Sequence, residues 1–198
     1  MTLSSIDTNK MCQEYVTILY SGQQEDRHNK KNIAETYGEI LYPSIDKLLS
    51  AISLTEQDIF LDLGSGIGKV VIQVFLTSCV KAAVGIEILS DQHQRAYHVA
   101  QRVRDELPEF YNGGRQLAFL QGDFFQLSLQ NATVVFMNSI CFDQTMLRKL
   151  GRMLNDLHHI HTILTTRPLP YLERFRFRKV VHVECSWDSA LCYIYQSK

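Results

Sequence analysis

Three glycines, Gly64, Gly66 and Gly68, alternate with other residues directly after an apolar run that contains Asp62. Glycine permits a tight turn and lets a ligand approach the backbone, and such turns often lie between a strand and a helix. The spacing here is GxGxG, whereas a dinucleotide fingerprint reads GxGxxG, and Lys69 occupies its last position. The pattern favours a nucleoside ligand without a pyrophosphate. The alternative is a turn that only packs a helix against a sheet.

Acidic residues near this turn indicate which nucleoside it could hold. Glu87 ends the next apolar run and could accept hydrogen bonds from both hydroxyls of a ribose. Asp62 could bind the methionine end of S-adenosyl-L-methionine through ordered water or helix-terminal groups. Asp123 is placed to bond the adenine amino group, with Phe124 against the ring, although a turn aspartate and a core phenylalanine are the alternative. We therefore expect this cofactor, with S-adenosyl-L-homocysteine as its product.

Asn138 is a candidate for the substrate side of the site. It follows the apolar run 133–137, at the edge where open α/β sheets bind their ligands. Its amide oxygen could orient a substrate amine. An asparagine that caps the following turn is the competing interpretation.

Apolar runs that read as strands alternate with stretches at helical spacing. The expected core strands lie at residues 59–63, 82–87, 116–121, 133–137 and 159–164. Two further runs, 177–184 and 190–195, are joined by a short connection, which predicts an antiparallel hairpin. The predicted fold is α/β: a single-domain, Rossmann-like class I methyltransferase fold with a seven-stranded, mostly parallel sheet ending in that C-terminal hairpin.

Short helices are expected before the first strand. Residues 11–20 place apolar side chains at helical spacing, and the polar run 23–32 reads as a loop. Ser44 is a candidate cap for a second helix. We assign residues 1–36 to an N-terminal helix and polar loop, and residues 37–198 to the S-adenosyl-L-methionine-dependent methyltransferase domain.

The composition excludes several classes of protein. Hydrophobic residues make up 45% of the 198 residues and charged residues 21%, which is typical of one globular domain. The formal net charge of −1 argues against strong nucleic-acid binding through overall charge. No apolar stretch is long enough for a membrane span, and five cysteines without a CxxC pair indicate a reducing compartment and no zinc site. We expect an intracellular, cytoplasmic monomer without a metal.

Several motifs occur together and in order along the chain. They are residues 37–39 (Tyr-Gly-Glu), the glycine turn, Glu87, residues 122–124, residues 131–142, and Ser186 with Trp187. In this combination, over about residues 37–195, the chain resembles the disruptor-of-telomeric-silencing (DOT) family of histone lysine methyltransferases, which lack a SET domain. The resemblance implies an S-adenosyl-L-methionine-dependent protein lysine N-methyltransferase.

The same resemblance implies roles for individual residues. Tyr37 and Glu39 would belong to a loop that closes over the cofactor, and Asn138, Trp187 and Tyr193 would line a narrow channel for a lysine. Such a channel suits the chemistry, because a lysine with a pKa near 10.4 loses its proton at neutral pH at a cost of about 4 to 5 kcal/mol. A dry aromatic passage disfavours the ammonium ion and excludes water.

Two features depart from the family pattern. Ser139 stands where the family has a second asparagine, and the connection from Trp187 to Tyr193 is shortened, so Tyr195 competes for the channel role. The nuclear members also carry a long lysine-rich extension, and this sequence stops at Lys198 without one. The expected partner is a protein presenting a lysine, with histone as one candidate and a nuclear location or export into a host cell left open. RNA or small-molecule methylation, and a catalytically silent cofactor-binding module, are the alternative functions.

Two weaker patterns need an explanation as well. Residues 174–179 alternate basic and aromatic side chains, which suits either a substrate-docking strip or a solvated edge strand that resists aggregation. His158, His159 and His161 gather near one strand but lack partners at metal-ligand spacing, so we interpret them as structural.

Overall fold

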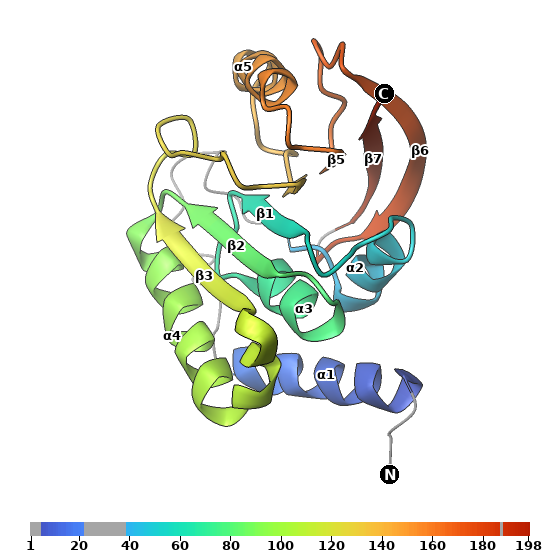
Figure 1. Ribbon diagram of the computed structural model, residues 1–198. Coiled ribbons are helices and arrows are strands. Elements are labelled where there is room, and N and C mark those ends of the chain that lie inside the picture. Colours follow the sequence, from blue (N-terminus) through green and yellow to red (C-terminus); the bar gives the residue numbers. More distant parts are fainter. Residues whose placement is uncertain (1–4, 22–38, 187) are drawn as a thin grey trace.

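The computed structural model describes residues 5–21, 39–186 and 188–198, and these residues form one sheet flanked by helices. Its seven strands, in the order β3-β2-β1-β4-β5-β7-β6, are β1 (Ile59–Leu63), β2 (Ala82–Glu87), β3 (Gln116–Gln121), β4 (Val134–Met137), β5 (Thr162–Thr165), β6 (Phe175–Glu184) and β7 (Ser189–Ser197). The first five strands are parallel, and β7 runs antiparallel between β5 and β6 (Figure 1). The predicted fold class, including the antiparallel hairpin, is confirmed.

Helices cover both faces of the sheet. The central strands β1, β2, β4 and β5 are therefore buried on both sides, whereas the edge strands β3 and β6 are partly exposed. The helices are α1 (Ser5–Tyr20), α2 (Tyr42–Leu49), α3 (Lys69–Thr77), α4 (Ser90–Glu106) and α5 (Gln144–Asp156), with a 3₁₀ segment at Pro108–Gly114. Side chains of α1 to α4 share one hydrophobic cluster, whereas α5 packs in a second cluster on the opposite face (Figure 1). Burial on both faces explains why these four parallel strands appear in the sequence as mostly continuous apolar runs.

The start of α2 differs from the prediction. Helix α2 begins at Tyr42 with Pro43 in its first turn, so Ser44 lies inside the helix and does not cap it. The Ser44 hydroxyl instead accepts a hydrogen bond from the Glu184 backbone N–H (2.8 Å), which joins α2 to β6. The predicted polar loop at 23–32 lies outside the described residues. Among the described residues, no helix is long and apolar enough to cross a membrane.

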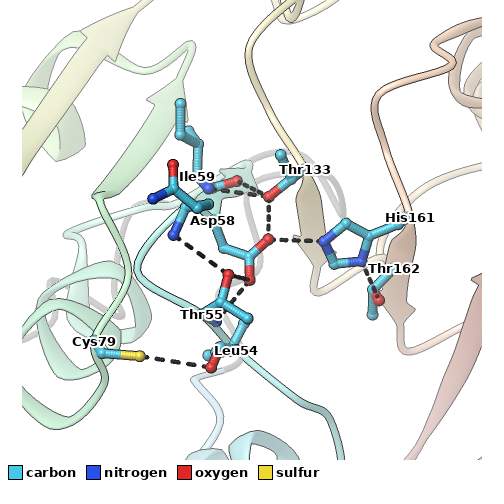
Figure 2. Close-up of polar contacts among 9 residues, drawn as sticks. Leu54, Thr55, Asp58, Ile59, Cys79, Thr133, His161 and Thr162 are labelled. Carbon is cyan, nitrogen blue, oxygen red and sulfur yellow. Dashed lines mark hydrogen bonds and ion pairs between the residues drawn. The ribbon is translucent and has the colours of Figure 1, made fainter.

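A polar network ties together the amino ends of β1, β4 and β5. Figure 2 shows His161, Thr133 and Thr55 converging on Asp58, which is only 4% exposed. Asp58 Oδ1 accepts from His161 Nε2 and Thr133 Oγ1 (both 2.7 Å), and Oδ2 accepts from the Thr55 backbone (2.7 Å) and hydroxyl (2.9 Å). Burial alone raises the pKa of Asp58, but the hydrogen bonds from these partners outweigh it and lower that pKa below its ordinary value. His161 thus has a structural role, as its sequence context indicates.

Replacing Asp58 by asparagine should lower the free energy of unfolding at pH 7 by about 1 to 3 kcal/mol, because an amide cannot accept all four hydrogen bonds. The folded-state pKa of Asp58 is depressed, so its contribution is present above the ordinary aspartate pKa and is lost as pH falls through the folded value. Urea unfolding should therefore show that the difference in the free energy of unfolding between wild type and Asp58→Asn is smaller at low pH than at pH 7. Asp105→Asn, at an exposed position of α4, is the matched control. A difference that stays constant down to pH 2 would contradict this prediction.

Candidate cofactor and substrate site

The glycine turn connects β1 to α3 at the carboxyl edge of the sheet. Gly64, Gly66 and Gly68 all adopt positive φ angles (82°, 56° and 87°), a region that side chains other than glycine rarely enter. A Cβ atom at Gly68 would also lie 2.4 Å from the ring of Phe119, so this glycine is required for packing. At Gly64 a Cβ would meet only the Phe142 ring, at 3.6 Å. The turn therefore approaches the sheet closely at Gly68 and is less crowded at Gly64.

Glu87 holds the turn from its position at the end of β2. The side chain is buried, with Oε2 accepting from the Gly66 N–H (2.8 Å) and Oε1 accepting from the Leu89 N–H (2.9 Å). One carboxylate thus links the glycine turn to the start of α4. Glu87 thus contacts the glycine turn directly, and a carboxylate in this place is suited to accept hydroxyl groups as well. Its predicted contact with a ribose stays a prediction.

Asp62 is the second buried carboxyl group at this edge. It is 2% exposed, and its Oδ1 has no hydrogen-bond partner among the described residues; the same is true of the buried Ser65 Oγ. Burial, and secondarily the negative charge of Glu87, raise the pKa of Asp62 well above its ordinary value. A buried carboxyl oxygen without a donor is costly unless a ligand supplies one. Asp62 and Ser65 therefore fit a ligand that brings hydrogen-bond donors or positive charge to the turn.

Asp123 and Phe124 lie beside this arrangement, because the Gly122 N–H donates to the Glu87 carbonyl oxygen (2.9 Å). The Asp123 carboxylate accepts from the Phe125 N–H (2.9 Å) and from Gln126 Nε2 (3.3 Å), so it stabilises its own turn. That is the alternative role weighed for this residue, and its contact with adenine stays a prediction.

Phe142 connects the two halves of the site, although it was part of a motif segment and had no predicted role of its own. Phe124 packs against Phe142 with ring centroids 6.0 Å apart, and the Phe142 ring also faces Gly64. These contacts join segments that are far apart in the sequence. An aromatic surface therefore lies between the glycine turn and the segment that contains Asn138.

Asn138 directly follows β4 and is oriented by the end of β5. The Thr166 hydroxyl donates to Asn138 Oδ1 (3.0 Å). The adjacent Ser139 is fully buried, and its hydroxyl bonds Thr165 Oγ1 (2.8 Å) and accepts from the Arg167 N–H (3.0 Å). The serine that replaces the family's second asparagine is thus part of a hydroxyl network that fixes the end of β4 against the end of β5.

The strand register distinguishes the two candidate tyrosines. Tyr193 is level with Thr165 of β5, which in turn is level with Met137, the residue before Asn138. Tyr195 is level with Ile163 and lies two residues further from the carboxyl edge. Both side chains are half-buried, and both rings lie near Phe177, at 6.4 and 5.9 Å between centroids. Tyr193 therefore lies at the same edge as Asn138.

Glu39 forms an ion pair with Lys69 at the start of α3, and its Oε1 has no partner among the described residues. Its backbone carbonyl accepts from the Ser186 N–H (2.8 Å), and Ile40 pairs with Cys185. Residues 39–40, which follow Tyr37 closely in the sequence, therefore lie beside residues 185–186, which directly precede Trp187. Tyr37 and Trp187 themselves lie outside the described residues.

A polar pocket of about 370 Å³ lies elsewhere, between the end of α2 and strands β6 and β7. Ile194 and Gln196 in its lining are level with the middle and the start of β5, away from the glycine turn. It contains none of the predicted site residues.

A sheet of this strand order, with a glycine turn after β1 and an acidic residue ending β2, defines the class I, Rossmann-like methyltransferase fold. An RNA methyltransferase from Salinibacter ruber in complex with S-adenosyl-L-homocysteine has a TM-score of 0.55 and 24% identity, covering 78% of this chain and 90% of that one. The magnesium protoporphyrin IX methyltransferase of Synechocystis PCC 6803, with bound S-adenosylmethionine, has a TM-score of 0.55 and 12% identity, with coverage of 100% and 99%. At these identities the likeness shows the fold alone.

The family model described as histone methylation protein DOT1 matches residues 15–183, and the chain belongs to this family. Histone-lysine N-methyltransferases specific for H3 lysine-79 are 31% identical over 150 residues in Caenorhabditis elegans and 28% over 127 residues in Drosophila melanogaster. These matches cover 73% and 62% of this chain, but only 16% and 7% of those relatives. A protein-lysine N-methyltransferase of Saccharolobus islandicus is 30% identical over 95 residues, covering 47% of this chain and 53% of the relative. The resemblance based on the motifs is confirmed.

Proposed function

We propose that this chain is an S-adenosyl-L-methionine-dependent protein lysine N-methyltransferase. The observation that carries the proposal is the arrangement of two buried carboxyl groups at the glycine turn of a DOT1-family chain. Glu87 holds the Gly66 N–H, and Asp62 presents an oxygen without a donor among the described residues. A ligand with ribose hydroxyls and a cationic methionine end satisfies both groups.

The cofactor would supply a methyl group bound to a sulfonium, and the protein would bind and orient it. Glu87 would accept the ribose hydroxyls, and Asp62 would face the ammonium group of the methionine end. Asp123 would bond the adenine amino group, with Phe124 against the ring. Glu39, together with Tyr37, would belong to the segment that closes the site.

The substrate would be a protein presenting a lysine, and the relatives named for histone H3 make a histone one candidate. Asn138, Trp187 and Tyr193 would line the passage in which the amine loses its proton and water is excluded. The strand register favours Tyr193 over Tyr195 for this role, because only Tyr193 is level with the end of β4. The chain's formal net charge of −1 supports a protein acceptor over one held by phosphate contacts. We also propose that the chain acts as a monomer inside the cell, in the cytoplasm or the nucleus.

Transfer of a labelled methyl group from S-adenosyl-L-methionine tests the proposal directly. The purified chain is incubated with histones, a cell lysate and total RNA, and the labelled products are analysed by mass spectrometry after hydrolysis. Methyl-lysine is the expected product. Label found only in RNA would support the RNA methyltransferase alternative, and cofactor binding without any transfer would support a silent binding module.

Replacing Asn138 by alanine should lower kcat for lysine methylation by about 10- to 100-fold, because small losses of positioning cost this much. Affinity for S-adenosyl-L-methionine should change by less than about twofold, since the glycine turn is intact. Thr166→Val should give a milder loss and Thr166→Ser should restore the rate, because the serine hydroxyl can still donate to Asn138. Asn112→Ala, at an exposed position of the 3₁₀ segment, is the control. Unchanged kcat in the Asn138 variant would remove this residue from the proposed site.

A further inference from the structure

Helix α1 reaches the glycine turn through the side chain of Tyr20. This residue ends α1, is 8% exposed, and donates its hydroxyl to the carbonyl oxygen of Ile67 at 2.9 Å. Ile67 lies between Gly66 and Gly68. The carbonyl of Gly68 accepts the N–H of Ile72 (3.0 Å), as in a regular helix, whereas the carbonyl of Ile67 accepts the tyrosine.

The Tyr20 ring also contacts the first residue of α3. The ammonium group of Lys69 lies 5.1 Å from the centroid of this ring and is ion-paired with Glu39. A cation in the first turn of a helix interacts unfavourably with the helix dipole. The ring and the carboxylate both offset that cost. Tyr20 therefore contacts the turn before α3 with its hydroxyl and the start of α3 with its ring.

Four side chains between Cys12 and Leu19 anchor α1 against α3 and α4, so Tyr20 is presented from a fixed support. Val16 and Leu19 are buried in the same cluster as α3 and α4. The Cys12 thiol lies 3.8 Å from the Leu76 carbonyl oxygen of α3, and the Tyr15 hydroxyl donates to Glu106 of α4 (2.7 Å). Helix α1 thus spans α3 and α4, and its last residue lies at the glycine turn.

We infer that Tyr20 is a positioning residue for the cofactor, an inference that rests on the proposed binding of S-adenosyl-L-methionine at the glycine turn. Glu87 holds the Gly66 N–H, and Tyr20 holds the carbonyl of Ile67, the next residue. Hydrogen bonds to two successive residues restrict a segment whose glycines otherwise allow many conformations. The tyrosine preorganises the turn, so less conformational freedom is lost when the ligand binds.

The variant Tyr20→Phe removes the hydroxyl and keeps the ring that packs in the core and faces Lys69. Calorimetry should show affinity for S-adenosyl-L-methionine lowered by about five- to tenfold, as expected for the loss of one hydrogen bond. Hydrogen exchange of the backbone N–H groups of residues 66–70 should be faster in the cofactor-free variant. Tyr15→Phe is the matched control, because it removes another tyrosine hydroxyl bond of α1, to Glu106, that does not touch the turn. Its cofactor affinity should stay within about twofold of wild type.

Unchanged affinity in Tyr20→Phe, with normal binding by wild type, would overturn the inference and leave the proposed function intact. An equal loss in Tyr15→Phe would also overturn it, because α1 would then act only as general support. Absence of binding by the wild-type chain would overturn the proposed function and the inference together.

Discussion

Replacing Glu87 by alanine is expected to weaken the binding of S-adenosyl-L-methionine by about 100-fold or more, as measured by calorimetry. Two effects add in this variant. The ribose hydroxyls lose a charged acceptor, which typically contributes about 1.5 to 3 kcal/mol, or roughly ten- to hundredfold in affinity, per bond. The Gly66 and Leu89 N–H groups also lose the carboxylate that fixes the glycine turn.

Glu87→Gln weakens both effects only in part, because it keeps the length of the side chain and one of the two acceptor oxygens. Its affinity should lie between those of the wild type and of Glu87→Ala. Glu109→Ala, at an exposed position of the 3₁₀ segment, is the control and should bind normally. Thermal unfolding checks that the variants are folded. Wild-type affinity in a folded Glu87→Ala protein would show that the cofactor is not bound through this residue.

Replacing Gly151 by alanine should destabilise the protein by about 3 kcal/mol, which reverses the usual gain from alanine in a helix of roughly 1 kcal/mol. A Cβ atom at this position of α5 would lie 1.8 Å from the carbonyl oxygen of Pro170. That oxygen belongs to the backbone, so it can retreat only if the loop after β5 moves. The next residue, Tyr171, has a positive φ of 63° and carries Arg152 over its ring (4.5 Å), which leaves the loop little freedom to adjust.

Urea unfolding at pH 7 measures this effect, and Thr145→Ala on the exposed face of α5 is the control. The control should be neutral or slightly stabilising, because alanine favours helices and nothing opposes it there. The same loop begins near Thr166, which orients Asn138, so a surviving Gly151→Ala protein should also show reduced kcat. Wild-type stability in this variant would mean that the loop yields easily, and the prediction would be wrong.

The parallel core was predictable because its central strands are buried on both faces and its edge strand β3 still buries Leu117 and Phe119. The apolar run at residues 59–63 coincides with β1, and residues 82–87 and 116–121 coincide with β2 and β3. Helix ends were less predictable. Ser44 is a residue type that often caps helices. Pro43, however, suits the first turn of a helix, and α2 begins before Ser44, at Tyr42. Asp143 is the residue that caps α5, with Oδ1 accepting from the Met146 N–H at 2.7 Å.

The basic and aromatic residues that alternate over 174–179 lie in different environments and do not form one regular strand. Arg174 donates to the backbone carbonyls of Asn155 in the last turn of α5 and of Leu157 and Ile160 beyond it, and Phe175 is buried in the core. A bulge between Phe177 and Lys179 then shifts the register. Alternating residue types predict alternating faces only if the strand is regular. A bulge adds a residue and shifts which side chains share a face, and the alternation itself does not indicate where a bulge will occur.

In the site, too, the features that depend on local sequence were predictable, and those that depend on contacts between distant segments were not. Glu87 and the glycines were predictable, because strand ends in a parallel sheet converge at one edge. Ser65, Phe142, Thr166 and Tyr20 were not singled out, since their roles depend on contacts between distant segments. Tyr20 bonds a residue 47 positions away, and Thr166 one 28 positions away. No spacing rule in a single sequence connects such pairs.

The place of β7 between β5 and β6 also governs the order in which the sheet can be built. During synthesis β5 and β6 leave the ribosome first, and neither has its neighbour in this part of the sheet until β7 follows. Until then both strands expose unpaired backbone groups, which are prone to pair with other chains. The simplest assembly route forms the β6–β7 hairpin first and docks it onto β5 in one step. A nascent chain halted before residue 189 should therefore need a chaperone to stay unaggregated.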